Sequence, residues 1–249
     1  MSLGIPDLSG RLALVTGASR GIGYQLALQL AGAGAEIIAV ARTVGGLEEL
    51  DDAITAKGGK CTLVPLDLKD HDGIDRLGGI IAERWGKLDI LVANAGILGT
   101  ITPVNQMKSK AFDELMNVNM TSVWRLMRTT DPLLRQSDAG RVILLSSSVA
   151  HTARAFWGPY AASKAAIEVL GRTWAAECEN TALRINIVNP GGTRTHMRAQ
   201  AMPGENPDVL PTAEETARKI MPLSSPDLEV TGKLWDVPTQ SWKEHRLPE

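Results

Sequence analysis

The fold of this chain is decided by the stretch LALVTGASRGIG, residues 12–23. Four apolar residues lead into a turn, and the helical pattern that follows carries Ile22, Leu26 and Leu30 on one face. Glycines in such a turn let the backbone approach a pyrophosphate, which the free N–H groups and the dipole of the helix N-terminus bind. A strand before the turn and a helix after it complete the context of a dinucleotide fingerprint. The residues that we expect at the nucleotide are Gly17, Ser19, Arg20, Gly21, Ile22 and Gly23.

The rest of the chain alternates short β-branched runs with longer helical patterns, which is typical of repeated βαβ units. Together these patterns predict one α/β domain over residues 1–249, with a doubly wound parallel sheet of about seven strands and helices on both faces, the Rossmann architecture. Strands are expected at Leu12–Thr16, Glu36–Ala41, Cys61–Leu66, Asp89–Ala93, Arg141–Ser146, Arg184–Asn189 and Lys233–Val237. Helices are expected near Gly21–Ala31, Gly46–Ala56, Asp72–Trp85, Ala111–Gln136, Tyr160–Glu179 and Ala213–Met221.

Two long loops are expected, at Ile97–Met107 and Gly191–Pro211. An open α/β sheet binds its ligands at the carboxyl ends of the strands, where such loops lie. The segment 191–211 is therefore interpreted as a lid over the substrate.

Composition excludes several classes of protein. The 249 residues include 26 Lys and Arg and 28 Asp and Glu, a formal net charge of -2, which argues against a dedicated nucleic-acid or polybasic membrane binder. No apolar run approaches the roughly 20 residues of a membrane span, and the N-terminus lacks a secretory signal, so we expect a cytoplasmic protein. Cys61 and Cys178 stand far apart without a CxxC or a matching His cluster, which indicates neither a disulfide framework nor a zinc site.

The choice between NAD and NADP is read at the end of the second strand. An acidic residue there would bind the ribose hydroxyls of NAD, whereas this chain has Ala41 and Arg42. With Arg20 of the glycine loop, Arg42 offers a second guanidinium to a 2′-phosphate. NADP(H) is therefore the preferred cofactor; the alternative is that both arginines are solvated surface charges.

Proton chemistry is indicated by Tyr160 and Lys164, whose i to i+4 spacing places a phenol and an ammonium on one face of a helix. A neighbouring cation is expected to lower the pKa of the phenol from about 10, which suits a general acid. The pair alone is a weak signal, because such pairs also occur by chance.

In combination with Ser147, thirteen residues before Tyr160, and with the glycine loop, these residues make the chain resemble the short-chain dehydrogenase/reductase family. The resemblance runs from Leu8 to about Val237 and extends to its bacterial 3-oxoacyl-[acyl-carrier-protein] reductase branch. Its further elements are Asp67, the sequence Asn94-Ala95-Gly96, Asn119, and Asn189-Pro190-Gly191 followed by Thr195.

The resemblance implies a role for each matching residue. Tyr160 would donate a proton to the substrate carbonyl oxygen, Ser147 would hydrogen-bond that oxygen, and Lys164 would bind the nicotinamide ribose. Asn119 would hold a water that relays protons, without any metal. The remaining cofactor contacts would come from Asp67 at the adenine, from Asn94 and Gly96, and from Pro190, Gly191, Thr193 and Thr195 at the nicotinamide.

Several features leave alternatives open. Ser148 would replace Ser147 if the strand carried a bulge, whereas Ser146 fits a purely structural role. His151 stands where many relatives have glycine, and Arg154 contacts either an anionic substrate or solvent. The usual Asp-Gly-Gly ending is replaced by Asp236-Val237-Pro238, which puts the last strand and its subunit contacts in doubt.

The sequence thus predicts an NADPH-dependent oxidoreductase that reduces a ketone, an aldehyde or a 3-oxoacyl thioester. The alternatives are an alcohol or sugar dehydrogenase that works oxidatively, and a nucleotide-binding regulator without turnover. A homo-oligomer, a tetramer as in most relatives, is expected through the helices at 111–136 and 160–179, where Ala165, Ala166, Leu170 and Trp174 form an apolar stripe. The physiological substrate is not predicted.

Overall fold

A single eight-stranded sheet runs through the computed structural model, which describes residues 4–244. Its strand order is β3-β2-β1-β4-β5-β6-β7-β8, and all neighbours are parallel except β7 and β8. The strands are β1 (Leu12–Thr16), β2 (Glu36–Ala41), β3 (Cys61–Pro65), β4 (Ile90–Ala93), β5 (Arg141–Leu145), β6 (Arg184–Asn189), β7 (Leu234–Asp236) and β8 (Ser241–Lys243). The predicted doubly wound Rossmann fold is confirmed, with one strand more than expected.

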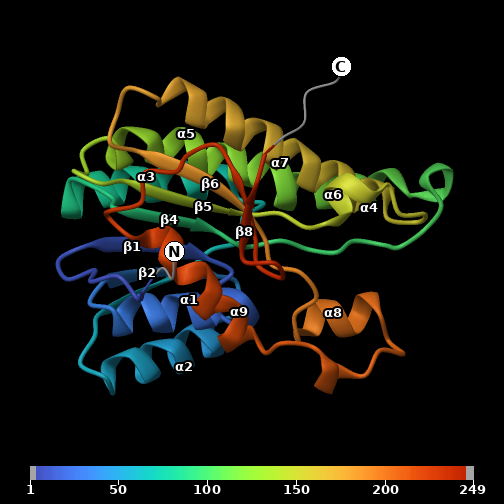
Figure 1. The fold of residues 1–249 in the computed structure, drawn as a ribbon, viewed down its shortest axis with the longest axis horizontal. Coiled ribbons are helices and arrows are strands. Elements are labelled where there is room, and N and C mark those ends of the chain that lie inside the picture. The colour runs from blue at the N-terminus through green and yellow to red at the C-terminus, as the bar shows by residue number, and fades with distance from the viewer. Residues whose placement is uncertain (1–3, 245–249) are drawn as a thin grey trace.

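Helices cover both faces of this sheet (Figure 1). One face carries α1 (Gly21–Gly32), α2 (Val44–Thr55) and α9 (Ala213–Ile220); the other carries α3 (His71–Trp85), α5 (Ser122–Leu134) and α7 (Gly158–Glu177). Shorter helices are α4 (Ser109–Met116), α6 (Val149–Thr152) and α8 (His196–Ala201). No helix within residues 4–244 is long and apolar enough to cross a membrane.

The core consists of two apolar clusters, one on each side of the sheet. Alternate residues of one strand enter different clusters: in β1, Ala13 and Val15 pack towards α1 and α9, whereas Leu12 and Leu14 pack towards α3 and α5. Because both faces are covered, every residue of β1 is buried, which explains why the strands read as continuous apolar runs.

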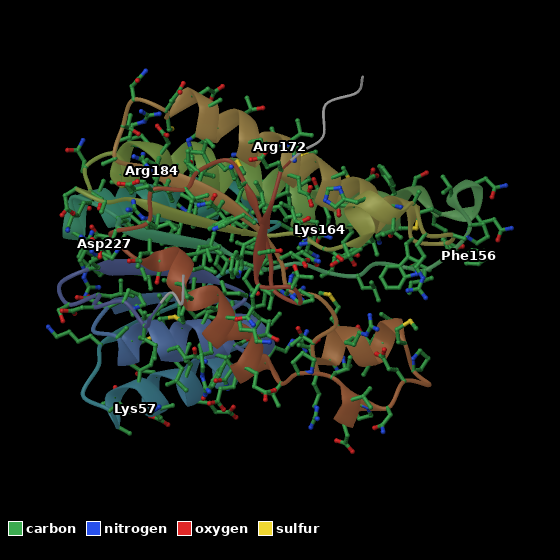
Figure 2. All side chains as sticks on the ribbon, in the orientation of Figure 1. Lys57, Phe156, Lys164, Arg172, Arg184 and Asp227 are labelled. Carbon is green, nitrogen blue, oxygen red and sulfur yellow. The ribbon has the colours of Figure 1, made fainter. Side chains whose placement is uncertain are left out.

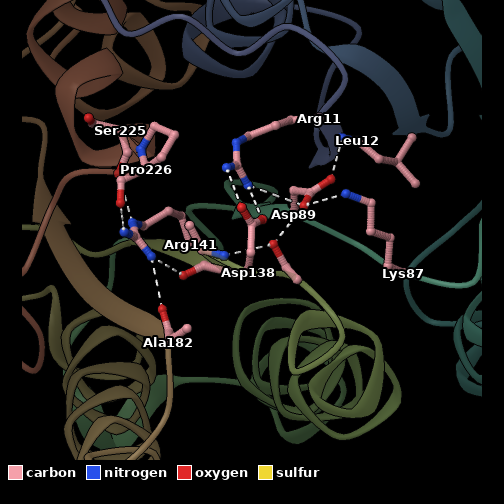
Figure 3. Close-up of polar contacts among 12 residues, drawn as sticks. Arg11, Leu12, Lys87, Asp89, Asp138, Arg141, Ala182, Ser225 and Pro226 are labelled. Carbon is pink, nitrogen blue, oxygen red and sulfur yellow. Dashed lines mark hydrogen bonds and ion pairs between the residues drawn. The ribbon is translucent and has the colours of Figure 1, made fainter.

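The amino ends of the strands are tied together by buried polar groups (Figure 3). Asp89 is fully buried and accepts hydrogen bonds from the backbone of Leu12 at 2.9 Å and from Ser137 Oγ at 2.6 Å, and it forms ion pairs with Arg11 and Lys87. The buried guanidinium of Arg141 donates to backbone carbonyls, including those of Ala182 and Ser225, and burial lowers its pKa to about 10. These contacts hold the amino edge, so the carboxyl ends of the strands remain available for a site.

Three expectations about secondary structure need correction. The helix expected at 111–136 is divided into α4 and α5 by a π-helical turn, Asn117–Thr121. The lid segment 191–211 is not a plain loop, because it contains α8 and a 3₁₀ turn at Pro207–Val209. The extra strand β8 pairs antiparallel with β7, and its Trp242 packs on Trp235 with ring centroids 5.0 Å apart.

Candidate active site

The glycine loop lies at the carboxyl end of β1, where tight packing excludes larger residues. Gly17 and Gly21 adopt positive φ angles of 68° and 61°, a conformation that favours glycine. A Cβ at Gly17 would stand 2.7 Å from Asn94 Nδ2, and one at Gly23 would collide with the Gly17 carbonyl oxygen. The loop therefore needs these glycines to bring the N-terminus of α1 against the strand ends.

Asn94 joins the glycine loop to β4. Its side-chain amide donates to the Thr16 carbonyl at 2.9 Å, while its backbone N–H and that of Ala95 donate to Thr16 Oγ1, both at 3.1 Å. The neighbouring β1 and β4 are where the strand order reverses direction, the usual ligand position in such sheets. Thr16, which the sequence analysis missed, fixes this junction.

A cavity of about 640 Å³ opens at this point. Most of the predicted site residues line it. The predicted residues that do not line it are Gly23, Asn119, Ser147, Gly191 and Thr193. The predicted residues that line it are Gly17, Ser19, Arg20, Gly21, Ile22, Arg42, Asp67, Asn94, Gly96, Tyr160, Lys164, Pro190 and Thr195.

Arg20 and Arg42 both line this cavity, and both are exposed. The carboxylate nearest to Arg42 belongs to Asp67, at 4.0 Å, with both side chains more than a third exposed. Such an exposed pair contributes little to stability, so both guanidiniums are available to an anion.

Tyr160 and Lys164 project from the first half of α7 into the cavity. The ammonium of Lys164 lies 5.8 Å from the centre of the Tyr160 ring and donates to the Leu145 carbonyl at 2.7 Å. Figure 2 labels Lys164 on α7 near the middle of the molecule. Lys164 is 4% exposed, and burial lowers its pKa to about 8, an effect that the Glu168 carboxylate opposes.

The expectation that Lys164 lowers the pKa of Tyr160 is wrong. Burial dominates and raises the pKa of the phenol to about 12, and hydrogen bonding by Ser147 reduces this rise. Removal from water disfavours the phenolate, and the lysine ammonium is bound to Leu145 rather than to the phenol oxygen. The phenol of Tyr160 is therefore protonated at neutral pH.

The three serines after β5 have different surroundings. Ser146 is buried and donates to Glu168 at 2.5 Å, which agrees with a structural role. Ser147 is half-buried on the side of Tyr160, and its Oγ accepts from the Val149 backbone at 3.5 Å. Ser148 is exposed and precedes α6.

Asn119 lies in the π-helical turn and is completely buried. Its Oδ1 accepts from the Ile97 backbone, and its Nδ2 donates to the Ile97 carbonyl, both at 2.8 Å. The widened turn allows this double contact, and such turns are frequent at functional sites. A Cβ at Gly96 would lie 3.3 Å from Asn119 Oδ1 and 3.5 Å from Lys164 Nζ, so the three residues meet at one corner of the site.

The family model described as short chain dehydrogenase matches residues 11–206 of this chain. The chain belongs to the short-chain dehydrogenase family.

Relatives of known sequence support this membership. The uncharacterized oxidoreductase YciK of Escherichia coli is 38% identical, covering 87% of this chain and 85% of its own. The 3-oxoacyl-[acyl-carrier-protein] reductase FabG of Pseudomonas aeruginosa is 33% identical, with 88% and 92% covered. An uncharacterized NAD-dependent oxidoreductase of Mycobacterium tuberculosis is 34% identical, with 77% and 74% covered. The predicted resemblance to the reductase branch is confirmed.

A solved structure extends the similarity to three dimensions. A short chain dehydrogenase of Shigella flexneri, crystallised with NADP, superimposes with a TM-score of 0.90 at 35% identity, covering 94% of this chain and all of that one. The eight-stranded fold is therefore shared by this short-chain dehydrogenase and its relative over nearly their whole lengths.

Within the segment 191–211 of this short-chain dehydrogenase, Thr195 precedes α8. The Thr195 hydroxyl caps α8 by accepting from the Arg198 backbone at 3.2 Å, and it also lines the cavity. A bidentate ion pair within the segment 191–211 joins Arg198 to Glu205, with two contacts of 2.6 Å. Thr193 is buried and its hydroxyl contacts Thr216 Oγ1 of α9 at 3.1 Å, so it ties the segment 191–211 to α9 and does not line the cavity.

Arg154, in the loop before Tyr160, contacts Met202 of the segment 191–211. Its guanidinium lies 5.2 Å from the Trp157 ring centre and 3.7 Å from the sulfur of Met202. Trp157 in turn packs edge-on against Tyr160 with centroids 6.1 Å apart. The neighbouring Phe156 is 55% exposed with φ of 72°, and Figure 2 places it at the far margin of the molecule.

Two further polar groups at the site were missed by the sequence analysis. The Leu145 carbonyl orients Lys164, and no side-chain pattern can reveal a backbone contact. Glu168, which is buried, follows Lys164 by four residues, and this spacing, one helical turn beyond the lysine, was the signal available in the sequence.

Proposed function

We propose that this short-chain dehydrogenase reduces a carbonyl compound with NADPH and uses Tyr160 as the general acid. The observation that carries this proposal is the position of Tyr160 and Lys164 in the cavity that the glycine loop also lines. A pure nucleotide sensor needs the loop but no buried proton donor beside it.

The chemistry of the cavity fits a dinucleotide. A Cβ at Gly17 or Gly23 would collide with Asn94, so these glycines let the N-terminus of α1 lie against the strand ends, where its N–H groups can bind a pyrophosphate. Arg20 and Arg42 supply the positive charge that a 2′-phosphate needs, and the Shigella relative was crystallised with NADP. When bound, NADPH supplies the hydride.

The residues of the chain then donate one proton to the substrate and replace it. Tyr160, with its pKa raised to about 12, holds the phenolic proton until negative charge develops on the carbonyl oxygen. Ser147 donates a hydrogen bond to the same oxygen, and Lys164 holds the ribose and stabilises the phenolate left on Tyr160. Asn119, which anchors the corner beside Lys164, positions the water that returns a proton to the site.

The substrate is a ketone, an aldehyde or a 3-oxoacyl thioester, covered by the lid 191–211. The similarity to FabG supports the thioester among these. A spectrophotometric screen of NADPH oxidation against ketones, aldehydes, quinones and 3-oxoacyl thioesters tests the proposal. Consumption with at least one carbonyl compound is expected, and consumption with none would contradict it.

The paired substitution Arg20→Ala with Arg42→Ala should weaken NADPH binding far more than NADH binding. Each charged hydrogen bond to a phosphate contributes about 1.5–3 kcal/mol, and only NADPH carries the 2′-phosphate. Fluorescence titration of both nucleotides at moderate salt measures the difference. Arg84→Ala, on the far end of α3, is the matched control and should change neither affinity. Equal binding of NADH and NADPH by the wild-type protein would contradict the preference.

We also propose a homo-oligomer, a tetramer, assembled through α4, α5 and α7. Trp174 of the expected apolar stripe is unavailable for this contact, because it is buried in the core and donates to Asp131 at 2.7 Å. Exposed apolar residues lie nearby instead, with Phe112 at 40%, Trp124 at 42% and Val169 at 54% exposure.

Light scattering at micromolar concentration should therefore show an assembly larger than one chain. Val169→Glu should dissociate it, since a charge would be buried in the interface. Val44→Glu, at a residue of α2 that is 47% exposed, is the control and should leave the assembly intact. A wild-type protein that scatters only as a monomer would rule out the oligomer but would not affect the proposed chemistry.

A further inference from the structure

A buried carboxylate lies one helical turn beyond Lys164 on α7. Glu168 of α7 is 2% exposed, and glutamate is rarely buried so completely unless its charge is paired. It follows Lys164 by one helical turn, and both side chains are buried on the same side of α7. The proposed mechanism gives Glu168 no role of its own, so its burial needs an explanation.

Three contacts hold the Glu168 carboxylate in place. Ser146 Oγ donates to it at 2.5 Å, His151 Nε2 lies at 2.9 Å, and an Arg172 guanidinium nitrogen lies at 3.6 Å. The contacts come from the end of β5, from α6 and from the next turn of α7. Glu168 therefore ties the helix that carries Tyr160 and Lys164 to the strand end that carries Ser147.

Ser146, which contacts Glu168, stands in the sequence between two residues of the site, Leu145 and Ser147. Ser146 follows Leu145, whose carbonyl accepts from Lys164 at 2.7 Å, and precedes Ser147. The position of the Glu168 carboxylate thus fixes the strand end on which the lysine ammonium rests. It also explains His151, which departs from the glycine of many relatives: its half-exposed imidazole covers the solvent side of the carboxylate.

We propose that Glu168 is a positioning residue for the reaction, whose carboxylate, held by Ser146 and His151, keeps Lys164 in the charged form that the proposed function requires. The inference rests on the proposed function only for the role of Lys164. Burial alone favours the neutral amine of Lys164, and the negative charge of Glu168 opposes this effect. A unit charge about one helical turn away changes a pKa by about one to two units at an effective dielectric constant of about 20.

The charged and titratable groups that bear on this coupling come from two elements. On α7 they are Tyr160 and Arg172, and on α6 the imidazole of His151. Arg172 is cationic at every accessible pH, and it competes with Lys164 for the same carboxylate. Removing the charge of Glu168 should therefore lower the pKa of Lys164, and removing the charge of Arg172 should raise it. A merely structural role of Glu168 would not produce these opposite shifts.

The test is an NMR titration of protein labelled with ¹³C at the lysine Cε, in which the Lys164 resonance is the one missing from Lys164→Met. The wild-type midpoint is expected at about 8. Glu168→Gln, which keeps the shape and an acceptor for Ser146, should lower it by about one unit or more. Glu177→Gln, at an exposed carboxylate near the other end of α7, should leave it unchanged.

A second variant keeps the inference testable if Glu168→Gln fails to fold. Arg172→Met, at a partly exposed side chain, should raise the Lys164 midpoint. An unchanged midpoint in Glu168→Gln, or a lowered or unchanged midpoint in Arg172→Met, would overturn the proposal.

NADPH titration of Glu168→Gln separates this inference from the proposed function. At pH 6, where Lys164 is charged in both proteins, the variant and the wild type should bind NADPH equally well. As the pH is raised, the NADPH affinity of the variant should begin to fall at a lower pH than that of the wild type. A lowered midpoint without any such change in NADPH binding would support the coupling and would overturn the role proposed for Lys164 at the nucleotide.

Discussion

Replacing Tyr160 by phenylalanine is expected to abolish turnover while NADPH binds as tightly as before. The phenol is the proton donor of the proposed reaction: Tyr160 lines the cavity, and burial raises the pKa of its phenol to about 12.

Phenylalanine keeps the ring and its edge-on packing against Trp157, so the loss should be confined to the proton. General acid catalysis contributes about 10²–10⁴-fold, and turnover should fall by at least that factor. Single-turnover kinetics alongside fluorescence titration of NADPH measures both quantities. If Tyr160→Phe kept a tenth of the wild-type turnover on a good substrate, another residue would have to be the acid.

Lys164→Ala is expected to damage both binding and turnover. The ammonium is proposed to hold the ribose and to stabilise the phenolate, and one charged hydrogen bond contributes about 1.5–3 kcal/mol, or roughly a 10- to 100-fold change in the dissociation constant of NADPH. Lys164→Met, which fills more of the buried space, should show the same two losses. The same titration and single-turnover assays measure them.

The control for both lysine variants is Lys57→Ala, at an exposed residue beyond α2. It should change neither binding nor turnover. A Lys164→Met protein that binds NADPH like the wild type would remove the ribose contact from the mechanism, whereas loss of binding without loss of turnover would remove its effect on Tyr160.

Much of the fold was predictable because the signals were local and repeated. The glycine loop stands between an apolar strand and an amphipathic helix, and each buried parallel strand reads as an apolar run. The eighth strand was missed because Ser241–Lys243 is only three residues long, and it is held by the packing of Trp242 on Trp235, which lies across a turn.

The candidate site was predictable in its residue types but not in its electrostatics. The spacing of Tyr160 and Lys164 showed that they share a helix face, but the pKa of the phenol depends on burial by surrounding elements. The division of the helix at Asn119 depends on its contacts with the Ile97 backbone, 22 residues away in sequence. Such tertiary contacts leave no periodic signal in the sequence.

In the proposed reaction, hydride reaches a substrate carbon in this cavity while Tyr160 supplies the proton. It is tested most directly with NADPH deuterated at both C4 positions and a carbonyl substrate found in the screen, with mass spectrometry of the alcohol product. One deuterium is expected on the carbinol carbon with the wild-type protein, and at least about 10²-fold less product is expected with Tyr160→Phe. Product without deuterium, or equal product from both proteins, would contradict it.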